Sequence, residues 1–132
     1  MNLPFLVAGA SALAGAAVHG GAGERLVLRK LFAGPLPSTP FGGHAATKAM
    51  IRATWHMTTI AFLTVGPVLV LSGSVLHGDT ARGIGLVAAC ASTGFAALAV
   101  GGAFAQAPRS LFHHPGPALL TAVAVLAWSG IA

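Results

Sequence analysis

This chain of 132 residues is 55% hydrophobic and only 7% charged, and its formal net charge is +5. Soluble domains carry about 25% charged residues, so this composition leaves too little polar surface for a water-soluble fold and predicts an integral membrane protein. The positive charge does not indicate a nucleic-acid partner. Most of the Lys and Arg lie between residues 25 and 52, a clustering that marks membrane topology.

Four apolar stretches cover residues 3–20, 51–72, 83–106 and 111–132. Each is close to the ~20 residues that an α-helix needs to cross a bilayer. We therefore expect an all-α, polytopic membrane protein in which residues 1–132 form a single transmembrane domain, a bundle of four transmembrane helices. The basic segment 21–50 and Arg109 place the first and third connections on the cytoplasmic side, with both termini on the opposite side.

The first and third stretches carry rows of small residues spaced four apart, which let a neighbouring helix approach closely. We predict that these two helices pack against each other. The row in the first stretch is Ala8, Ala12, Ala16 and Gly20, and the row in the third is Ala89, Thr93, Ala97 and Gly101, beside Ser92, Ala96 and Val100.

The segment after the first stretch alternates charged and apolar residues from Glu24 to Phe32. This pattern predicts a short amphipathic helix lying in the membrane interface. Its basic side chains Arg25, Arg29 and Lys30 would face anionic lipid headgroups. The proline- and glycine-rich residues 34–43 that follow are expected to form a loop.

The second apolar stretch contains a proline, and the fourth is short for a membrane-spanning helix. Gly66-Pro67 falls near the middle of the second stretch, where a proline removes a backbone hydrogen bond and predicts a kink. The fourth stretch follows Pro115-Gly116-Pro117, and the 16 residues after Gly116 make about 24 Å of helix at 1.5 Å per residue. This is shorter than a hydrocarbon core of ~30 Å.

Histidines gather at the helix ends on the predicted cytoplasmic side. Imidazole is a common ligand of metals and of haem iron, so His19, His56, His113 and His114 are candidate ligands. Interfacial histidines more often cap helices or contact headgroups, and no cofactor is predicted, with haem or a metal kept as an alternative. The chain has no phosphate-binding loop, metalloprotease helix, Cys-x-x-Cys pair or nucleophile elbow. We assign no catalytic residue and favour a protein that is not an enzyme.

A candidate polar cluster consists of His19, Glu24, Arg52, Trp55 and His56. Glu24 is the only carboxylate on the basic side, and a carboxylate removed from water needs charged partners. We expect a network that ties the first connection to the start of the second helix. A proton or cation relay through His19 and His56 is the functional alternative.

Two segments resemble a family of small bacterial inner-membrane proteins with four predicted spans. They are His19-Gly20-Gly21-Ala22-Gly23-Glu24-Arg25 and Arg52-Ala53-Thr54-Trp55-His56-Met57-Thr58-Thr59. Their shared pattern is His, three residues, Gly-Glu-Arg, a basic loop, and Trp-His at the start of the second helix. The resemblance covers about residues 10–72. It implies a four-span fold in the bacterial inner membrane, with periplasmic termini, and it implies no activity.

The sequence is compatible with three functions. The first is an accessory or oligomerising subunit of a membrane assembly, with lipids and either copies of the chain or other subunits as partners. The second is a transporter or channel for a small solute or ion, which would have to be an oligomer because four helices enclose little room. The third is a haem- or metal-binding redox protein that uses the cytoplasmic-side histidines.

Overall fold

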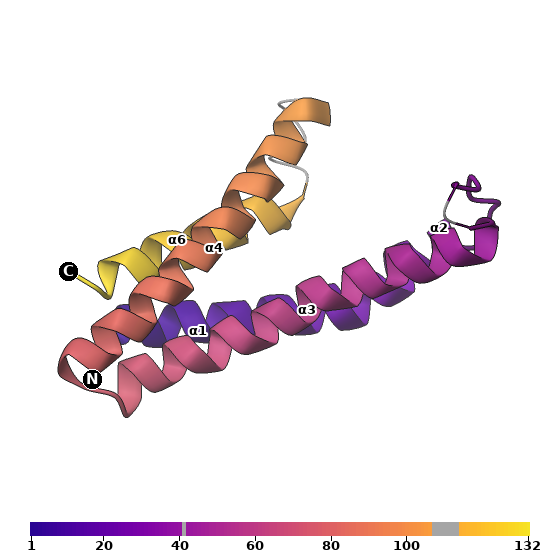
Figure 1. Ribbon diagram of the computed structural model, residues 1–132. Helices are drawn as coiled ribbons and strands as arrows, with labels where there is room; N and C mark the ends of the chain where they lie inside the picture. Colours follow the sequence, from indigo (N-terminus) through magenta and orange to yellow (C-terminus); the bar gives the residue numbers. More distant parts are fainter. Residues whose placement is uncertain (41, 107–113) are drawn as a thin grey trace.

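The computed structural model describes residues 1–40, 42–106 and 114–132, and in these residues the chain is all-α (Figure 1). The prediction of an all-α fold is confirmed. The elements are α1 (Leu3–Ala17), the π-helical segments η1 (Val18–Ala22) and η2 (Glu24–Leu28), α2 (Arg29–Leu31), α3 (His44–Ser74), α4 (Gly78–Gln106) and α6 (Pro115–Ser129).

Within the described residues, three helices are long and apolar enough to cross a membrane, namely Leu3–Leu31, His44–Ser74 and Gly78–Ala105. They indicate a multi-pass membrane protein. The fourth apolar helix, α6, has 15 residues, which amounts to about 22 Å at 1.5 Å per residue. It is therefore shorter than the ~30 Å hydrocarbon core, and the part of the fourth stretch before it, residues 111–113, lies outside the described residues.

The first helix does not end near residue 20. It runs through η1, η2 and α2 to Leu31, and Gly23, which joins the two π-helical segments, keeps helical angles of φ −63° and ψ −39°. The prediction of a separate interfacial helix is wrong, because the chain changes its hydrogen-bonding register to i→i+5 instead of breaking. Arg25, Arg29 and Lys30 are exposed on this continuation, and their contact with headgroups remains a prediction.

The helices form two antiparallel hairpins, α1 with α3 and α4 with α6, which spread apart toward one end (Figure 1). α1 also packs on α6, and α3 also packs on α4. The predicted pairing of the first and third apolar helices is therefore wrong over most of their length. α1 meets α4 through Phe5, whose ring lies against Gly85.

Glycines allow α1 and α3 to pack closely against each other. A Cβ atom added at Gly9 would lie 2.7 Å from the carbonyl oxygen of Gly66, and one added at Gly66 would lie 2.7 Å from Cγ of Leu13. Farther along, a Cβ at Gly73 would lie 2.9 Å from the carbonyl oxygen of Asn2. The two backbones approach so closely that only hydrogen atoms fit between them at these points. α3 continues as one helix through Pro67.

The two predicted rows of small residues differ in burial. Ala8, Ala12 and Ala16 are buried in the packing of α1, and Gly20 is half-buried against Thr59. In the predicted row of α4, only Ala89 is buried, and the other three residues are exposed. The buried residues of α4 include Ala88, Ala89, Ser92 and Ala96, and the exposed members of the predicted row are Thr93, Ala97 and Gly101.

Both ends of the chain lie at the same end of the molecule. The side-chain amide of Asn2 donates to the carbonyl oxygen of Gly130 at 2.6 Å, and its backbone N–H donates to the carbonyl oxygen of Gly73 at 2.8 Å. At the opposite end, the loop after α2 is held to α3, because Lys48 Nζ donates to the carbonyl oxygen of Phe32 at 2.8 Å. Thr47 likewise donates to the carbonyl oxygen of Pro37 at 2.9 Å.

Candidate functional site

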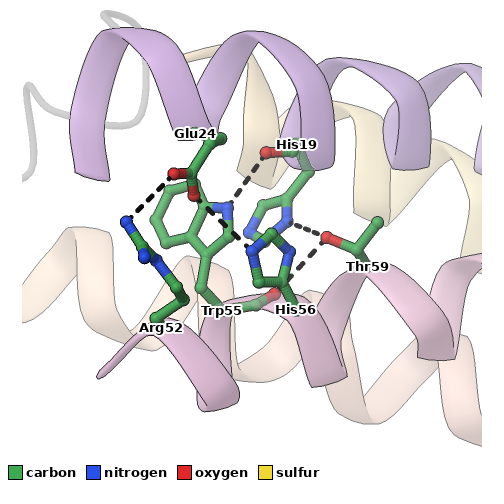
Figure 2. A network of polar contacts seen from close by, with 6 residues as sticks. All are labelled: His19, Glu24, Arg52, Trp55, His56 and Thr59. Carbon is green, nitrogen blue, oxygen red and sulfur yellow. Dashed lines mark hydrogen bonds and ion pairs between the residues drawn. The ribbon is translucent and has the colours of Figure 1, made fainter. Parts of the chain in front are cut away.

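The five residues of the predicted polar cluster lie together between the π-helical part of the first helix and the N-terminal half of α3 (Figure 2). His19 and Glu24 come from η1 and η2. Arg52, Trp55 and His56 come from two successive turns of α3, where spacings of three and four residues place them on neighbouring rows. The antiparallel packing of α1 on α3 continues through this region and brings the two sets face to face.

Glu24 contacts two cationic or ionisable groups of α3. Its Oε1 lies 3.3 Å from Nη2 of Arg52, and its Oε2 lies 3.5 Å from Nε2 of His56. Within the described residues, Oε2 is buried and accepts no hydrogen bond, so the contact with His56 is electrostatic and long. Arg52 also lies over the ring of Phe32, 5.2 Å from its centre, which positions the guanidinium between a carboxylate and an aromatic face.

His19 is fixed from two sides. Its imidazole stacks on the indole of Trp55, with ring centres 4.2 Å apart and planes 15° apart, and Trp55 Nε1 donates to the carbonyl oxygen of His19 at 3.0 Å. His19 Nδ1 lies 2.9 Å from Thr59 Oγ1, whose hydroxyl donates to the carbonyl oxygen of Trp55. With its one proton used there, the threonine oxygen accepts from Nδ1 of His19, and the other ring nitrogen of a neutral imidazole is left as an acceptor.

Thr59 is the member of the cluster that the sequence analysis missed. It follows Trp55 by four residues, so it lies one helical turn away on the same face. The four-residue spacing from Trp55 could have identified Thr59 as part of the cluster. Gly20 makes its approach possible, because a Cβ there would lie 2.7 Å from Cγ2 of Thr59. Gly23 likewise makes room for Trp55, because a Cβ added at Gly23 would lie 2.5 Å from Cζ2 of the indole.

The cluster coincides with the two π-helical segments. π-Helical turns are rare and occur frequently at functional sites. Here they widen the helix where His19 and Glu24 point toward α3 (Figure 2). Together with the glycine approaches, they allow His19 to reach a partner 40 residues away and Glu24 to reach one 28 residues away.

A large cavity opens beside the cluster, between the two hairpins. Its volume is about 780 Å³, and it is lined mainly by apolar side chains from α1, α3, α4 and the start of α6. Phe62 and Phe95 meet edge to face across it, 5.4 Å between ring centres. His19, Trp55 and His114 line it near one end. This volume lies in the range of small-molecule sites.

The histidines do not gather into a metal site among the residues that the structure describes. There, no group of three His, Cys, Asp or Glu side chains is close enough to hold a metal ion. His19 and His56 belong to the polar cluster, and His114 caps α6, its Nδ1 accepting from the backbone N–H of Gly116 at 3.1 Å. His113 lies outside the described residues.

Comparison of the chain with known protein families, with curated proteins and with solved structures finds no match in any of the three. The resemblance to four-span bacterial inner-membrane proteins therefore stays a prediction. What the geometry itself offers is a cross-helix polar network, an adjacent apolar cavity, and an outer surface of α4 made of small residues.

Proposed function

We propose that this chain is a non-enzymatic membrane protein that works as a subunit, assembling with other copies or with a partner through the outer surface of α4. The observation that carries the proposal is the position of the small residues of α4. Cys90, Thr93, Gly94, Ala97 and Gly101 are all exposed, and each lies three or four residues from another member of the set. We call them the small face of α4.

A helix surface that meets only lipid gains nothing from small side chains, whereas a helix-helix contact does, because small residues let two backbones approach. The first helix of this chain uses its own row in that way, since Ala8, Ala12 and Ala16 are buried. The small face of α4 is chemically similar but exposed, and α6 reaches it at Thr93, whose Oγ1 accepts from Trp128 Nε1 at 3.0 Å. An external helix is the partner that its composition favours.

The polar cluster supports a structural role within such a subunit. Glu24 binds Arg52, and His19 is held by Thr59 and Trp55, so every one of these contacts joins the first helix to α3. A relay from Glu24 through His56 to His19 is less favoured, because in the described residues His19 is hydrogen-bonded to Thr59 and not to His56. We propose that the cluster fastens the open end of the α1–α3 hairpin.

The assembly is tested through Cys90, the single cysteine of the chain. In native membranes, a thiol-specific oxidant should join Cys90 of one chain to Cys90 of another if two small faces meet. Native mass spectrometry of gently extracted protein should show the same dimer, or a complex with a foreign subunit. A protein that is monomeric in both measurements contradicts the proposal.

Ala97→Phe supplies the perturbation, because it places a large ring in the middle of the small face. It should abolish the cross-link and the assembly. The matched control is Ala99→Phe, two residues along the same helix. Its side chain points about 200° away, at 3.6 residues per turn, and lines the cavity instead. The control should cross-link as the parent does.

A further inference from the structure

We propose that the cavity between the two hairpins binds one anionic phospholipid of the surrounding bilayer, with an acyl chain in the cavity and the headgroup at the end marked by His19 and His114. This proposal goes beyond assembly and does not depend on it. Three features of the described residues carry it: the length of the cavity, its gradient of polarity and the charge at its open end.

The length fits one leaflet of a membrane. Along the first helix the cavity extends from Ser11 to Val27, which is about 24 Å at 1.5 Å per residue. Half of a bilayer with its headgroups measures about 20–22 Å. Ser11 lies eight residues after Leu3, about 12 Å into the helix, near the middle of a ~30 Å hydrocarbon core. Val27 lies beyond that core, at headgroup depth.

The polarity of the lining changes in the same direction. The deep part is walled by Ala12, Val65 and Val123, and the middle by the rings of Phe62 and Phe95. Two hydroxyls lie at this depth, Ser11 of the first helix and Ser92 of α4, and that of Ser92 donates to the carbonyl oxygen of Ala88 in its own helix. The other polar side chains of the lining come at the opposite end, and they are His19, Trp55, Thr58 and His114. An acyl chain below a polar headgroup has this same order.

The charge at the polar end selects an anionic headgroup. Arg25, Arg29, Lys30, Lys48 and Arg52 belong to the segments that form this end, against one carboxylate, Glu24. Five positive charges minus one negative charge leave an excess of four. Glu24 is already paired with Arg52, and Lys48 donates to the carbonyl oxygen of Phe32, so Arg25, Arg29 and Lys30 are the cations left to attract phosphate. Basic residues at a membrane surface attract anionic lipid headgroups.

A compact ligand suits the cavity less well. A flat ring system would fill the width near Phe62 and Phe95 but would leave the deep part beside Ala12 and Val123 empty. A lipid chain fills the whole length. The hairpins spread apart on this side (Figure 1), so a lipid can enter sideways from the bilayer without unfolding either hairpin.

The first test is native mass spectrometry of the protein taken from its own membrane. The parent should retain one anionic phospholipid per chain. Ala99→Phe, which puts a ring into the cavity, should lose it, and Ala97→Phe on the opposite side of α4 should keep it. The two variants separate the proposals, since Ala97→Phe removes assembly and Ala99→Phe removes the lipid. Equal lipid in both variants, or haem or a partner helix in place of lipid, overturns the inference.

A second measurement tests lipid binding without the Ala99→Phe variant, and so applies even if that variant folds poorly. The chain has two tryptophans, and Trp55 lines the cavity, so a Trp128→Phe background leaves Trp55 as the only fluorophore. Vesicles of zwitterionic phospholipid would contain a minor fraction of lipid with brominated chains, either anionic or zwitterionic. Bromine should quench Trp55 much more strongly on the anionic lipid. Equal quenching by the two headgroups contradicts the proposal.

Discussion

The closest approach between helices, where Gly9 of α1 meets Gly66 of α3, makes the sharpest prediction about stability. In Gly9→Ala the new Cβ would lie 2.7 Å from the carbonyl oxygen of Gly66 and 2.9 Å from the backbone nitrogen of Val70. Both are backbone atoms inside a helix, so neither can rotate away as a side chain would. The two helices must separate.

The size of the effect follows from these distances. Ordinary contact begins at 3.4 Å, and 3.4 minus 2.7 gives a separation of 0.7 Å at the crossing. Overpacking of this kind costs about 1–3 kcal/mol. Replacing glycine by alanine within a helix contributes about 1 kcal/mol in the other direction. We expect Gly9→Ala to be neutral to destabilising by about 2 kcal/mol.

Gly102→Ala is the matched control, because a Cβ at Gly102 meets nothing within 4 Å. It should gain up to about 1 kcal/mol from helix propensity alone, so the two variants should differ by about 1–3 kcal/mol. The assay is thermal or denaturant unfolding of the purified protein in mild detergent, followed by circular dichroism. Equal stabilisation by both substitutions would show that α1 and α3 do not touch at Gly9.

Three further experiments address the cluster and the core. In a double-mutant cycle of Glu24→Gln and Arg52→Gln, measured by the same unfolding assay, the coupling should be about 0.2–1 kcal/mol, because the pair is partly exposed; zero coupling would mean that the ion pair does not form. Trp55→Phe keeps an aromatic ring beside His19 but removes the indole N–H, and should cost about 0.5–1.5 kcal/mol; an unchanged midpoint would argue against this hydrogen bond. Ala8→Leu enlarges a side chain that is 0% exposed and does not line the cavity, and it should destabilise the protein by about 1–3 kcal/mol, whereas unaltered unfolding would show that the packing around Ala8 is loose.

The sequence was informative about the polar cluster because few residues in the chain carry charge. Glu24 is the only carboxylate in the basic part of the sequence, and the positions of Arg52 and His56 on successive turns of the next helix made them the natural candidates for its partners. The helical class was equally predictable from long apolar runs. These conclusions depend on composition and spacing, which are local properties.

The pairing of helices was not predictable in the same way. A small-residue row shows that a backbone approach is possible but not which helix makes it, and α1 found its partner at Gly66 and Gly73 of α3. On α4, two adjoining rows are almost equally small, so spacing did not distinguish the buried Ser92–Ala96 row from the exposed Thr93–Ala97 row. The π-helical register was also invisible, because it depends on the choice between i+4 and i+5 partners along an otherwise ordinary helical sequence.

The hydrogen bond from Asn2 to Gly130 spans 128 positions of the chain, and this has a consequence for biosynthesis. Contacts so distant in sequence form late, because the intervening chain must first be made and folded. The amide of Asn2 has no access to this acceptor until Gly130 has been synthesised. The hairpin of α1 and α3 can pair as soon as its own residues are in the membrane, so we expect this hairpin to form first and the α4–α6 hairpin to close against it at the end of insertion.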